Sequence, residues 1–285
     1  MCLGKMPRPR SNGSMMLEHE GRFLRLLASA KEAEVYLWEE GKVVRLLRRT
    51  DGRQQLEREA GAMAAVAGSG GPVPRVFELV HVAGRPGLVM ERLSGSEMGR
   101  ALTAKPWRAG PLGRVLGTTH SNINALGAPA GLPSMVDGLR RVIEKEPTLT
   151  SDLRNIALSM LGTLSEGASL CHGDFHPANV ILDDRRGALV IDWPNACRGD
   201  HHGDVARTLL LLGYAQPPGV PPPLRPVVAA VRRRLTRSYL TAYRQELPID
   251  MGKVRRWQVV WAARRFSEGL PGERASMEKV IRGRA

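Results

Sequence analysis

The chain has 285 residues, 42% of them hydrophobic, which is enough for one large domain or for two lobes that share a cleft. Its apolar runs fall well short of the roughly 18 residues that a membrane span needs, so we expect no membrane contact. The net charge of +14 is concentrated beyond residue 205, where sixteen Lys and Arg stand against five Asp and Glu. This charge permits anion or nucleic-acid binding. Because no nucleic-acid-binding motif accompanies it, we expect no specific nucleic-acid partner.

Cysteines are few, at Cys2, Cys171 and Cys197, and their spacing fits no metal site. Such a set is typical of a reducing compartment, so we expect a cytoplasmic protein. Residues 1–20 are interpreted as a disordered leader, because basic residues near the start are not followed by an apolar signal region. We interpret Cys171 as a small buried residue rather than a nucleophile.

The N-terminal third predicts a small sheet with one helix. Short apolar runs between turn residues predict strands, at 22–27, 35–38, 43–47, 76–82 and 88–91. Apolar residues at spacings of three and four predict a helix over 54–67. Small residues at 94–96 mark a boundary, so we place an N-terminal lobe at 21–94 and a C-terminal lobe at 95–285.

The remainder of the chain predicts a mainly helical lobe. Apolar stripes at helical spacing predict its helices, at 112–123, 136–143, 153–164, 204–214, 224–243 and 254–261. A proline-rich break interrupts them at 217–223. We expect the last residues, 276–285, to fray.

One stretch of this lobe carries residues typical of phosphoryl transfer. Asp174 and Asn179 have the spacing Asp-x-x-x-x-Asn, which protein kinases use in the loop that holds a catalytic base and a magnesium ligand. Asn179 opens an apolar run, 180–182, and a second run, 188–191, ends at Asp192. If the two runs form a hairpin, Asp192 emerges beside Asn179.

An amide oxygen and a carboxylate in this arrangement fit a hard cation such as magnesium. Asp174, just upstream, would receive the proton of an attacking hydroxyl. The simpler interpretation is that these residues only form turns, since Asp and Asn bond to their own backbone. The flanking His172 and Pro177, and the carboxylate at the far end of the hairpin, favour the site.

The motif His-Gly-Asp-x-His-Pro-x-Asn at 172–179, followed by Ile-Asp-Trp at 191–193, resembles the aminoglycoside phosphotransferase and choline kinase-like family. The resemblance implies an α+β, protein-kinase-like fold with a small antiparallel sheet lobe and a larger helical lobe. It also implies phosphorylation of a small-molecule hydroxyl, with Asp174 as the base and with Asn179 and Asp192 as ligands of Mg2+.

Two further residues have supporting roles by this resemblance. His172 precedes the base in the loop, and Asp204 matches an Asp that opens the next helix and braces the catalytic loop. A plain helix N-cap is the alternative for Asp204. His120, on an earlier helix, is interpreted as a packed or surface residue rather than a ligand.

The resemblance also implies how the donor, ATP or GTP, is held. Arg45 occupies the register where the family usually has Lys, with Lys42 as the alternative phosphate-binding residue. Glu59 is expected to pair with Arg45, and Glu57 is its competitor.

The hinge is expected at Glu91 to Leu93, where backbone groups would bond the adenine ring. The loop at 29–33, which would cover the phosphates, departs from the family because it has no glycine. Acceptor binding is expected among the C-terminal helices, where Trp257 and Trp261 are interpreted as core residues, with an aromatic wall of the acceptor site as the alternative.

We therefore predict a small-molecule kinase, a monomer or homodimer, that phosphorylates a metabolite or an antibiotic. Because polycationic aminoglycosides need acidic partners, the basic C-terminal region favours a neutral or anionic acceptor. One alternative is a catalytically weak, nucleotide-binding regulatory protein, which Arg45 and the glycine-free loop favour and the intact Asp174 opposes. Another is a nucleic-acid-binding protein, which rests on charge alone.

Overall fold

The computed structural model describes residues 16–30, 32–214, 220–269 and 271–283. The chain forms two compact units. Of the described residues, the N-terminal unit comprises 16–95 together with Ile181–Pro194, and the C-terminal unit comprises Ser96–Val180 and residues 195–283. The segment at 181–194 is thus part of the N-terminal unit, although the motif that contains it was expected to lie wholly in the second lobe.

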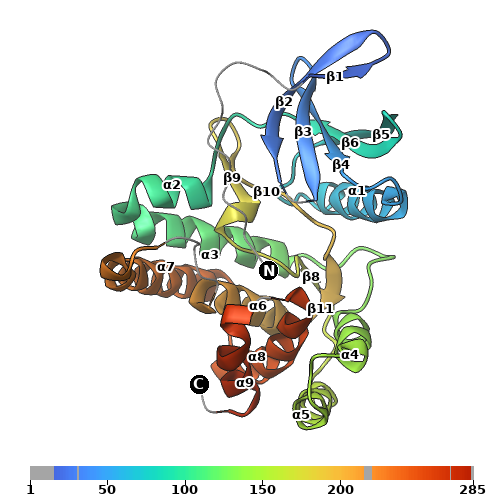
Figure 1. The fold of residues 1–285 in the computed structure, drawn as a ribbon. Coiled ribbons are helices and arrows are strands. Elements are labelled where there is room, and N and C mark those ends of the chain that lie inside the picture. Colours follow the sequence, from blue (N-terminus) through green and yellow to red (C-terminus); the bar gives the residue numbers. More distant parts are fainter. Residues whose placement is uncertain (1–15, 31, 215–219, 270, 284–285) are drawn as a thin grey trace. The chain divides into compact units, whose positions relative to one another are not determined.

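The N-terminal unit is built on a six-stranded antiparallel sheet with the order β1-β2-β3-β4-β6-β5 (Figure 1). Its strands are β1 (Met16–His19), β2 (Arg22–Ser29), β3 (Ala33–Glu39), β4 (Lys42–Leu47), β5 (Val76–Val82) and β6 (Arg85–Glu91). Alternate residues of these strands form a buried cluster that includes Tyr36, Val44 and Val89. Helix α1 (Arg53–Gly68) buries its apolar stripe, in which Leu56 and Met63 lie.

Strand β1 is a difference from the sequence prediction, because residues 16–19 fall in the stretch expected to be a disordered leader. Leu17 pairs with Leu24 of β2 and packs against the buried cluster. A short apolar–polar alternation therefore extends the sheet by one strand. Residues 1–15 lie outside the described residues.

The C-terminal unit is mainly helical, as predicted. Its helices are α2 (Met98–Ala104), α3 (Ala109–Ala125), α4 (Met135–Lys145), α5 (Ser151–Leu161), α6 (His201–Tyr214), α7 (Arg225–Glu246), α8 (Met251–Arg265) and α9 (Arg274–Ile281). Two short strands, β8 (Ser169–Cys171) and β11 (Cys197–Gly199), pair antiparallel ahead of α6. They fix the two ends of the segment that contains the motif.

The predicted elements recur with shifted ends. Helix α6 begins three residues before the predicted start at residue 204, and α5 ends at Leu161 rather than at residue 164. The prediction that 276–285 fray is wrong for most of that stretch, because α9 buries Met277, Val280 and Ile281. The predicted proline-rich break lies partly outside the described residues, and Pro222–Leu224 form a 3-10 turn.

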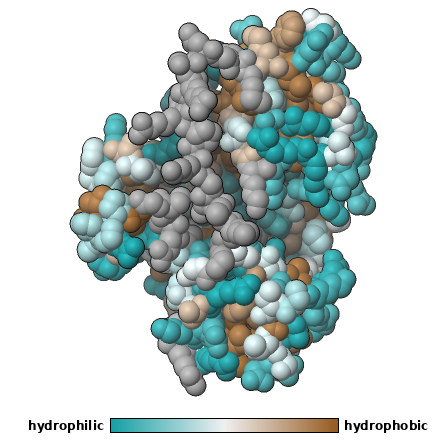
Figure 2. Space-filling view, in the orientation of Figure 1, coloured by the Kyte–Doolittle hydropathy of each residue, from teal (hydrophilic) through white to brown (hydrophobic). Residues whose placement is uncertain are grey.

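Trp257 and Trp261 are both buried, which confirms their interpretation as core residues. None of the described helices has the length and apolar character needed to cross a bilayer. On the face shown in Figure 2, hydrophobic residues occur in separate patches among hydrophilic ones.

Helices α3 and α7 run side by side at close range (Figure 1). Two glycines of α3 make this approach possible. A Cβ on Gly113 would lie 2.5 Å from the carbonyl oxygen of Leu235, and one on Gly117 would lie 2.3 Å from that of Tyr239. These distances are too short for any side chain, so the spacing of the two helices depends on glycine at both positions.

We expect Gly117→Ala to lower the free energy of unfolding by about 1–3 kcal/mol, because the new methyl group would push against the α7 backbone. Gly138→Ala in α4 is the matched control, since a Cβ there would meet no atom within 4 Å. This second substitution should stabilise the protein by roughly 0.5–1 kcal/mol. Urea unfolding of both variants checks this expectation, and equal effects in the two helices would contradict it.

Candidate active site

The loop that follows β8 is bound at its backbone by one carboxylate of α6. Asp204 accepts hydrogen bonds from the backbone N–H of His172 at 2.8 Å and from that of Gly173 at 2.9 Å. Gly173 has φ +76°, and a Cβ on it would lie 2.5 Å from the carbonyl oxygen of Asn195. The loop therefore needs glycine at this position, and its entry is fixed by Asp204.

Asp204 is fully buried, yet it stays ionised because it accepts further hydrogen bonds. Asn124 Nδ2 donates to it at 3.0 Å, and His120 Nε2 lies 2.9 Å away. Burial alone would raise the pKa of Asp204, but the charge and hydrogen bond of His120, the hydrogen bond of Asn124 and the charge of His172 together outweigh burial and hold the pKa at about 2. His120 is buried and bonds Tyr239 as well, which confirms that it is a packed residue.

Asp204 lies in the first turn of α6 but does not cap it. The helix begins at His201, and the carboxylate of Asp200 accepts a hydrogen bond from the His202 N–H at 2.9 Å. The N-cap alternative for Asp204 is therefore wrong, because the helix starts one turn earlier than the apolar pattern indicated.

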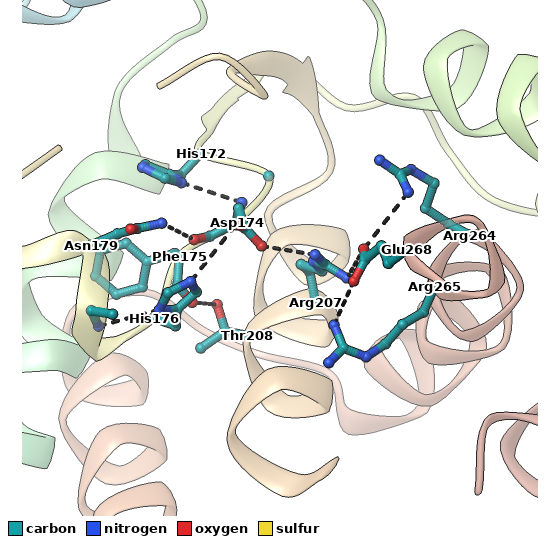
Figure 3. Close-up of polar contacts among 12 residues, drawn as sticks. His172, Asp174, Phe175, His176, Asn179, Arg207, Thr208, Arg264, Arg265 and Glu268 are labelled. Atoms are coloured by element: carbon teal, nitrogen blue, oxygen red, sulfur yellow. Dashed lines mark hydrogen bonds and ion pairs between the residues drawn. The ribbon is translucent and has the colours of Figure 1, made fainter. Parts of the chain in front are cut away.

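Asp174 projects from the loop between two basic side chains (Figure 3). Its Oδ1 lies 2.8 Å from Arg207 Nη2, and its Oδ2 lies 3.7 Å from His176 Nε2. Since His176 Nδ1 accepts the Ala178 N–H, the ring proton is on Nε2 and points to Asp174. Partial burial acts to raise the pKa of Asp174, but His176 and Arg207 outweigh it and hold the pKa well below its usual range.

Arg207 is a site residue that the sequence analysis missed. Its guanidinium is almost fully buried and bridges Asp174 to Glu268, whose Oε1 lies 2.8 Å from Arg207 Nη1. Burial would lower the pKa of Arg207, but Glu268 and Asp174 raise it, so the cation persists. Its position in the sequence could have identified it, because Arg207 lies three residues after Asp204 and therefore on the same helical face.

Thr208 adds a third contact from the same face of α6. Its hydroxyl donates to the carbonyl oxygen of Phe175 at 2.9 Å, and the Phe175 ring stacks on His120 with centroids 4.1 Å apart. Asp204, Arg207 and Thr208 thus hold three successive parts of the loop, at the helical spacings i, i+3 and i+4.

Asn179 lies in the short turn Pro177–Asn179 at the end of the loop. Its Nδ2 donates to the backbone carbonyl of Asp174 at 3.0 Å, which fixes the side chain, and its Oδ1 has no hydrogen bond to another described residue. Asp174 and Asn179 are thus brought together in the C-terminal unit. Asp192 belongs to the N-terminal unit, so its predicted meeting with Asn179 stays a prediction.

In the N-terminal unit Arg45 of β4 pairs with Glu59 of α1 through Nη2 and Oε2. The competitor Glu57 is exposed and pairs with Arg53 instead, at 2.8 Å, while Lys42 pairs with Glu39. Burial raises the pKa of Glu59, although Arg45 opposes that rise. The contact expected between Arg45 and Glu59 is confirmed, and their role in nucleotide binding stays a prediction.

Asp192 follows the hairpin of β9 (Val180–Asp183) and β10 (Gly187–Val190). Its φ is +65°, a left-handed conformation that is unusual for a residue with a side chain. Asp192 is exposed, and its charge acts to raise the pKa of Glu59, so it lies within electrostatic reach of the Arg45–Glu59 pair.

The expected hinge follows β6. The Glu91 side chain is engaged, because its carboxylate accepts from the Arg75 N–H at 3.0 Å and lies 2.6 Å from Arg186 Nη1. Arg92 donates its N–H to Gly41. Among the described residues, the backbone groups of Leu93 have no hydrogen-bond partner, and their expected bonds to the adenine ring stay a prediction.

The glycine-free loop between β2 and β3 is held by Arg48, the residue that follows β4. Arg48 Nε donates to the Ala30 carbonyl at 3.0 Å, and its Nη2 donates to the Ser29 hydroxyl at 2.7 Å. Residue 31 lies outside the described residues. The loop is thus braced by a side chain where the family was expected to use glycine.

Cys171, the residue before His172, is fully buried, and burial raises the pKa of its thiol well above the usual range. A thiol in that state is a poor nucleophile, which confirms its interpretation as a small buried residue.

Residues 23–255 of the chain match the model of the phosphotransferase enzyme family. No curated protein matches the chain. Several solved structures are similar to it in fold. A thermostable mutant of aminoglycoside phosphotransferase APH(4)-Ia, in a ternary complex with ADP and hygromycin B, has a TM-score of 0.60 and 17% identity, with 92% of this chain and 91% of that chain covered.

Two more solved structures are similar. Aminoglycoside phosphotransferase APH(3'')-Id from Streptomyces rimosus, in complex with ADP and streptomycin, has a TM-score of 0.55 and 17% identity over 81% of this chain and 90% of its own. The apoenzyme of macrolide 2'-phosphotransferase MphH from Brachybacterium faecium has a TM-score of 0.55 and 19% identity over 90% and 91%. These likenesses confirm the predicted kinase-like fold, with an antiparallel sheet in one part and helices in the other.

We expect the ionised Asp204 to make stability depend on acid pH. The folded pKa of about 2 lies below the roughly 3.9 of an unfolded chain, so the stabilisation is present above about pH 4 and is lost as the pH falls towards 2. Asp204→Asn removes the charge. The wild type should therefore exceed this variant in unfolding free energy at neutral pH, and the difference should narrow by on the order of 2 kcal/mol in acid.

Denaturant unfolding of both proteins at several pH values between about 7 and 2.5 measures that difference directly. A difference that is constant across the range would contradict the ionised state of Asp204.

Proposed function

The chain belongs to the phosphotransferase enzyme family, and from this premise we propose that it transfers the terminal phosphoryl group of ATP or GTP to a hydroxyl of a small molecule. Membership confirms the resemblance seen in the motif and the expected class of enzyme, a phosphotransferase with an alcohol group as acceptor. Solved structures of similar fold contain ADP together with hygromycin B or streptomycin, which supports a nucleotide donor and a small-molecule acceptor.

The observation that carries the proposal is the state of Asp174. It is a partly exposed carboxylate, held ionised and in one position by Arg207 and His176. Its backbone carbonyl also anchors the amide of Asn179. Such an arrangement presents a fixed acceptor for the proton of a substrate hydroxyl, next to an amide oxygen that is free to bind a cation.

The lowered pKa of Asp174 decides how it acts. A weak base does not deprotonate an alcohol before reaction. In the loose transition state of phosphoryl transfer the attacking oxygen gains acidity only late, when bond formation is advanced. Asp174 therefore orients the hydroxyl for in-line attack and takes its proton after most of the charge has moved.

Asn179 Oδ1 and the carboxylate of Asp192 are the hard oxygen donors that Mg2+ prefers, and the Asp192 carboxylate has no hydrogen bond to another described residue. We propose that both hold this ion. When bound, magnesium neutralises charge on the donor's phosphates. Arg45, oriented by Glu59, contributes a fixed cation to the same phosphates. Leu93 contributes backbone hydrogen-bonding groups to the adenine or guanine ring of the nucleotide.

A regulatory protein that binds nucleotide without turnover is the second candidate. The braced, glycine-free loop at 29–33 favours it, because such a loop approaches phosphate less closely. The kinase requires Asp174 for turnover, whereas the regulatory protein has no turnover. Substitution of Asp174 therefore distinguishes the two candidate functions.

We expect Asp174→Asn to reduce turnover by about 10²–10⁴-fold, because the amide cannot take up the proton. The assay follows ADP or GDP release with a panel of sugars, amino alcohols, hydroxy acids and aminoglycosides. Nucleotide affinity, measured by calorimetry, should change little, since Asp174 contacts the acceptor.

Asp184→Asn is the matched control, because this exposed carboxylate in the β9–β10 turn carries the same charge change away from the loop. It should keep wild-type turnover. Near-normal activity of Asp174→Asn would overturn the assignment. Nucleotide binding without phosphate transfer to any acceptor, in the wild type as well, would favour the regulatory protein.

A further inference from the structure

A second arginine, Arg264, lies at the end of α8 close to the Asp174 network. In Figure 3 Glu268 stands between Arg264 and Arg207. Arg264 is positioned locally, because its Nη1 donates to the hydroxyl of Ser267 and lies 3.7 Å from Glu268 Oε1. Nε and Nη2 of Arg264 have no hydrogen bond to another described residue, and neither is a buried atom. Two donors of a fixed guanidinium are therefore available.

Two ion-paired side chains, Glu268 and Arg207, connect Arg264 to the proposed base. Arg264 Nη1 and Arg207 Nη1 lie 3.7 Å and 2.8 Å from the same oxygen, Glu268 Oε1, and Arg207 Nη2 lies 2.8 Å from Asp174 Oδ1. A small molecule that spans this short network would present one group to Arg264 and its hydroxyl to Asp174.

The two carboxylates of this network, Asp174 and Glu268, are already engaged. Asp174 is taken by Arg207 and His176. Glu268 is taken by Arg207 at 2.8 Å and by Arg265 at 2.7 Å. Neither carboxylate is left to receive an ammonium group of an acceptor.

Glu146 is the third carboxylate that acts on Arg264, and it is engaged too. It is buried and accepts from the N–H of Thr148 at 3.0 Å and from its hydroxyl at 2.6 Å. A polycationic acceptor would thus have to break existing ion pairs or hydrogen bonds, at a cost of desolvation and lost contacts.

We propose that the acceptor carries an acidic group, a carboxylate or a phosphate, which binds the free edge of Arg264 while its hydroxyl binds Asp174. A guanidinium edge matches such an anion with two parallel hydrogen bonds, which fixes both position and orientation. This inference rests on the proposed function, and it names the substrate class of the same site.

The test compares acceptors in matched acidic and neutral pairs. The pairs are gluconate with sorbitol, glycerate with glycerol, and glucose 6-phosphate with glucose, and kanamycin represents the polycations. The first two pairs test a carboxylate and the third a phosphate. The acidic member of at least one pair should have a kcat/KM higher by about tenfold or more, and Arg264→Gln should abolish that preference.

Arg255→Gln is the matched control, since Arg255 is an exposed residue of α8 that has no ion pair with another described residue. It should keep the preference. Two results would overturn the inference: a wild type that prefers neutral acceptors or kanamycin, or an Arg264→Gln variant that loses kcat equally with both members of a pair. An equal loss of kcat with both members would mean that Arg264 contacts the transferred phosphoryl group rather than the acceptor.

Failure of the proposed function has a different signature, because it would leave every acceptor unphosphorylated. In that case a binding measurement still tests whether Arg264 binds an anion. Gluconate, without nucleotide, should raise the unfolding temperature of the wild type more than sorbitol does, and Arg264→Gln should remove the difference. Equal shifts with gluconate and sorbitol in the wild type would overturn the anion site.

Discussion

The buried carboxylate of Asp204 is the constraint on which the candidate site depends. A charge without solvent is stable only if hydrogen bonds replace its water, and Asp204 obtains them from two backbone N–H groups of the loop, from Asn124 and from His120. Because its partners include the backbone of His172 and Gly173, the loop at 172–179 cannot move away without leaving a buried charge unsatisfied. A rigid loop is thus a consequence of placing an ionised group in the interior.

Helix α6 also fixes Asp174, the proposed base. Arg207, one turn further along α6, holds the carboxylate of Asp174 and is itself balanced by Glu268. Opposite charges alternate onward through Arg265 to Glu273. Such a chain lets three arginines and three carboxylates of this part of the unit, counting Arg264, lie at low exposure without a large net charge. In a site that works by positioning and electrostatics, prior fixation of these groups saves reorganisation during reaction.

Features of the fold and of the site could be predicted from the sequence where the residues that form them lie close together along the chain. Asp174, Asn179 and Asp192 occur within a short stretch at spacings tied to a loop and a hairpin, so the motif predicted them together. Strand and helix periodicity predicted most elements, but not α2 or the last helix, since the burial of Met277 and Ile281 comes from packing of α9 on α8 and α5. Arg207 shares a helical face with Asp204, so helical periodicity could have predicted that it faces the same loop.

Glu268 and Arg264 were not predictable in this way. They lie some ninety residues beyond the motif, in a stretch that matched the family only in its helical character, and the contact between Glu268 and Arg207 exists only in the folded chain. The Arg45–Glu59 pair was predictable only because the resemblance supplied a register for the strand and the helix. Side chains that complete a site from a distance require the fold itself.

We propose that Asn179 and Asp192 hold one magnesium ion for the donor. A double-mutant cycle tests it: the affinity for Mg2+ in the presence of saturating ATP is measured for the wild type, Asn179→Ala, Asp192→Ala and the double variant. Ligands of one ion are coupled, so the double variant should lose clearly less than the sum of the two single losses. Losses that add to within about 0.5 kcal/mol would mean that the two residues act independently, and would contradict the account.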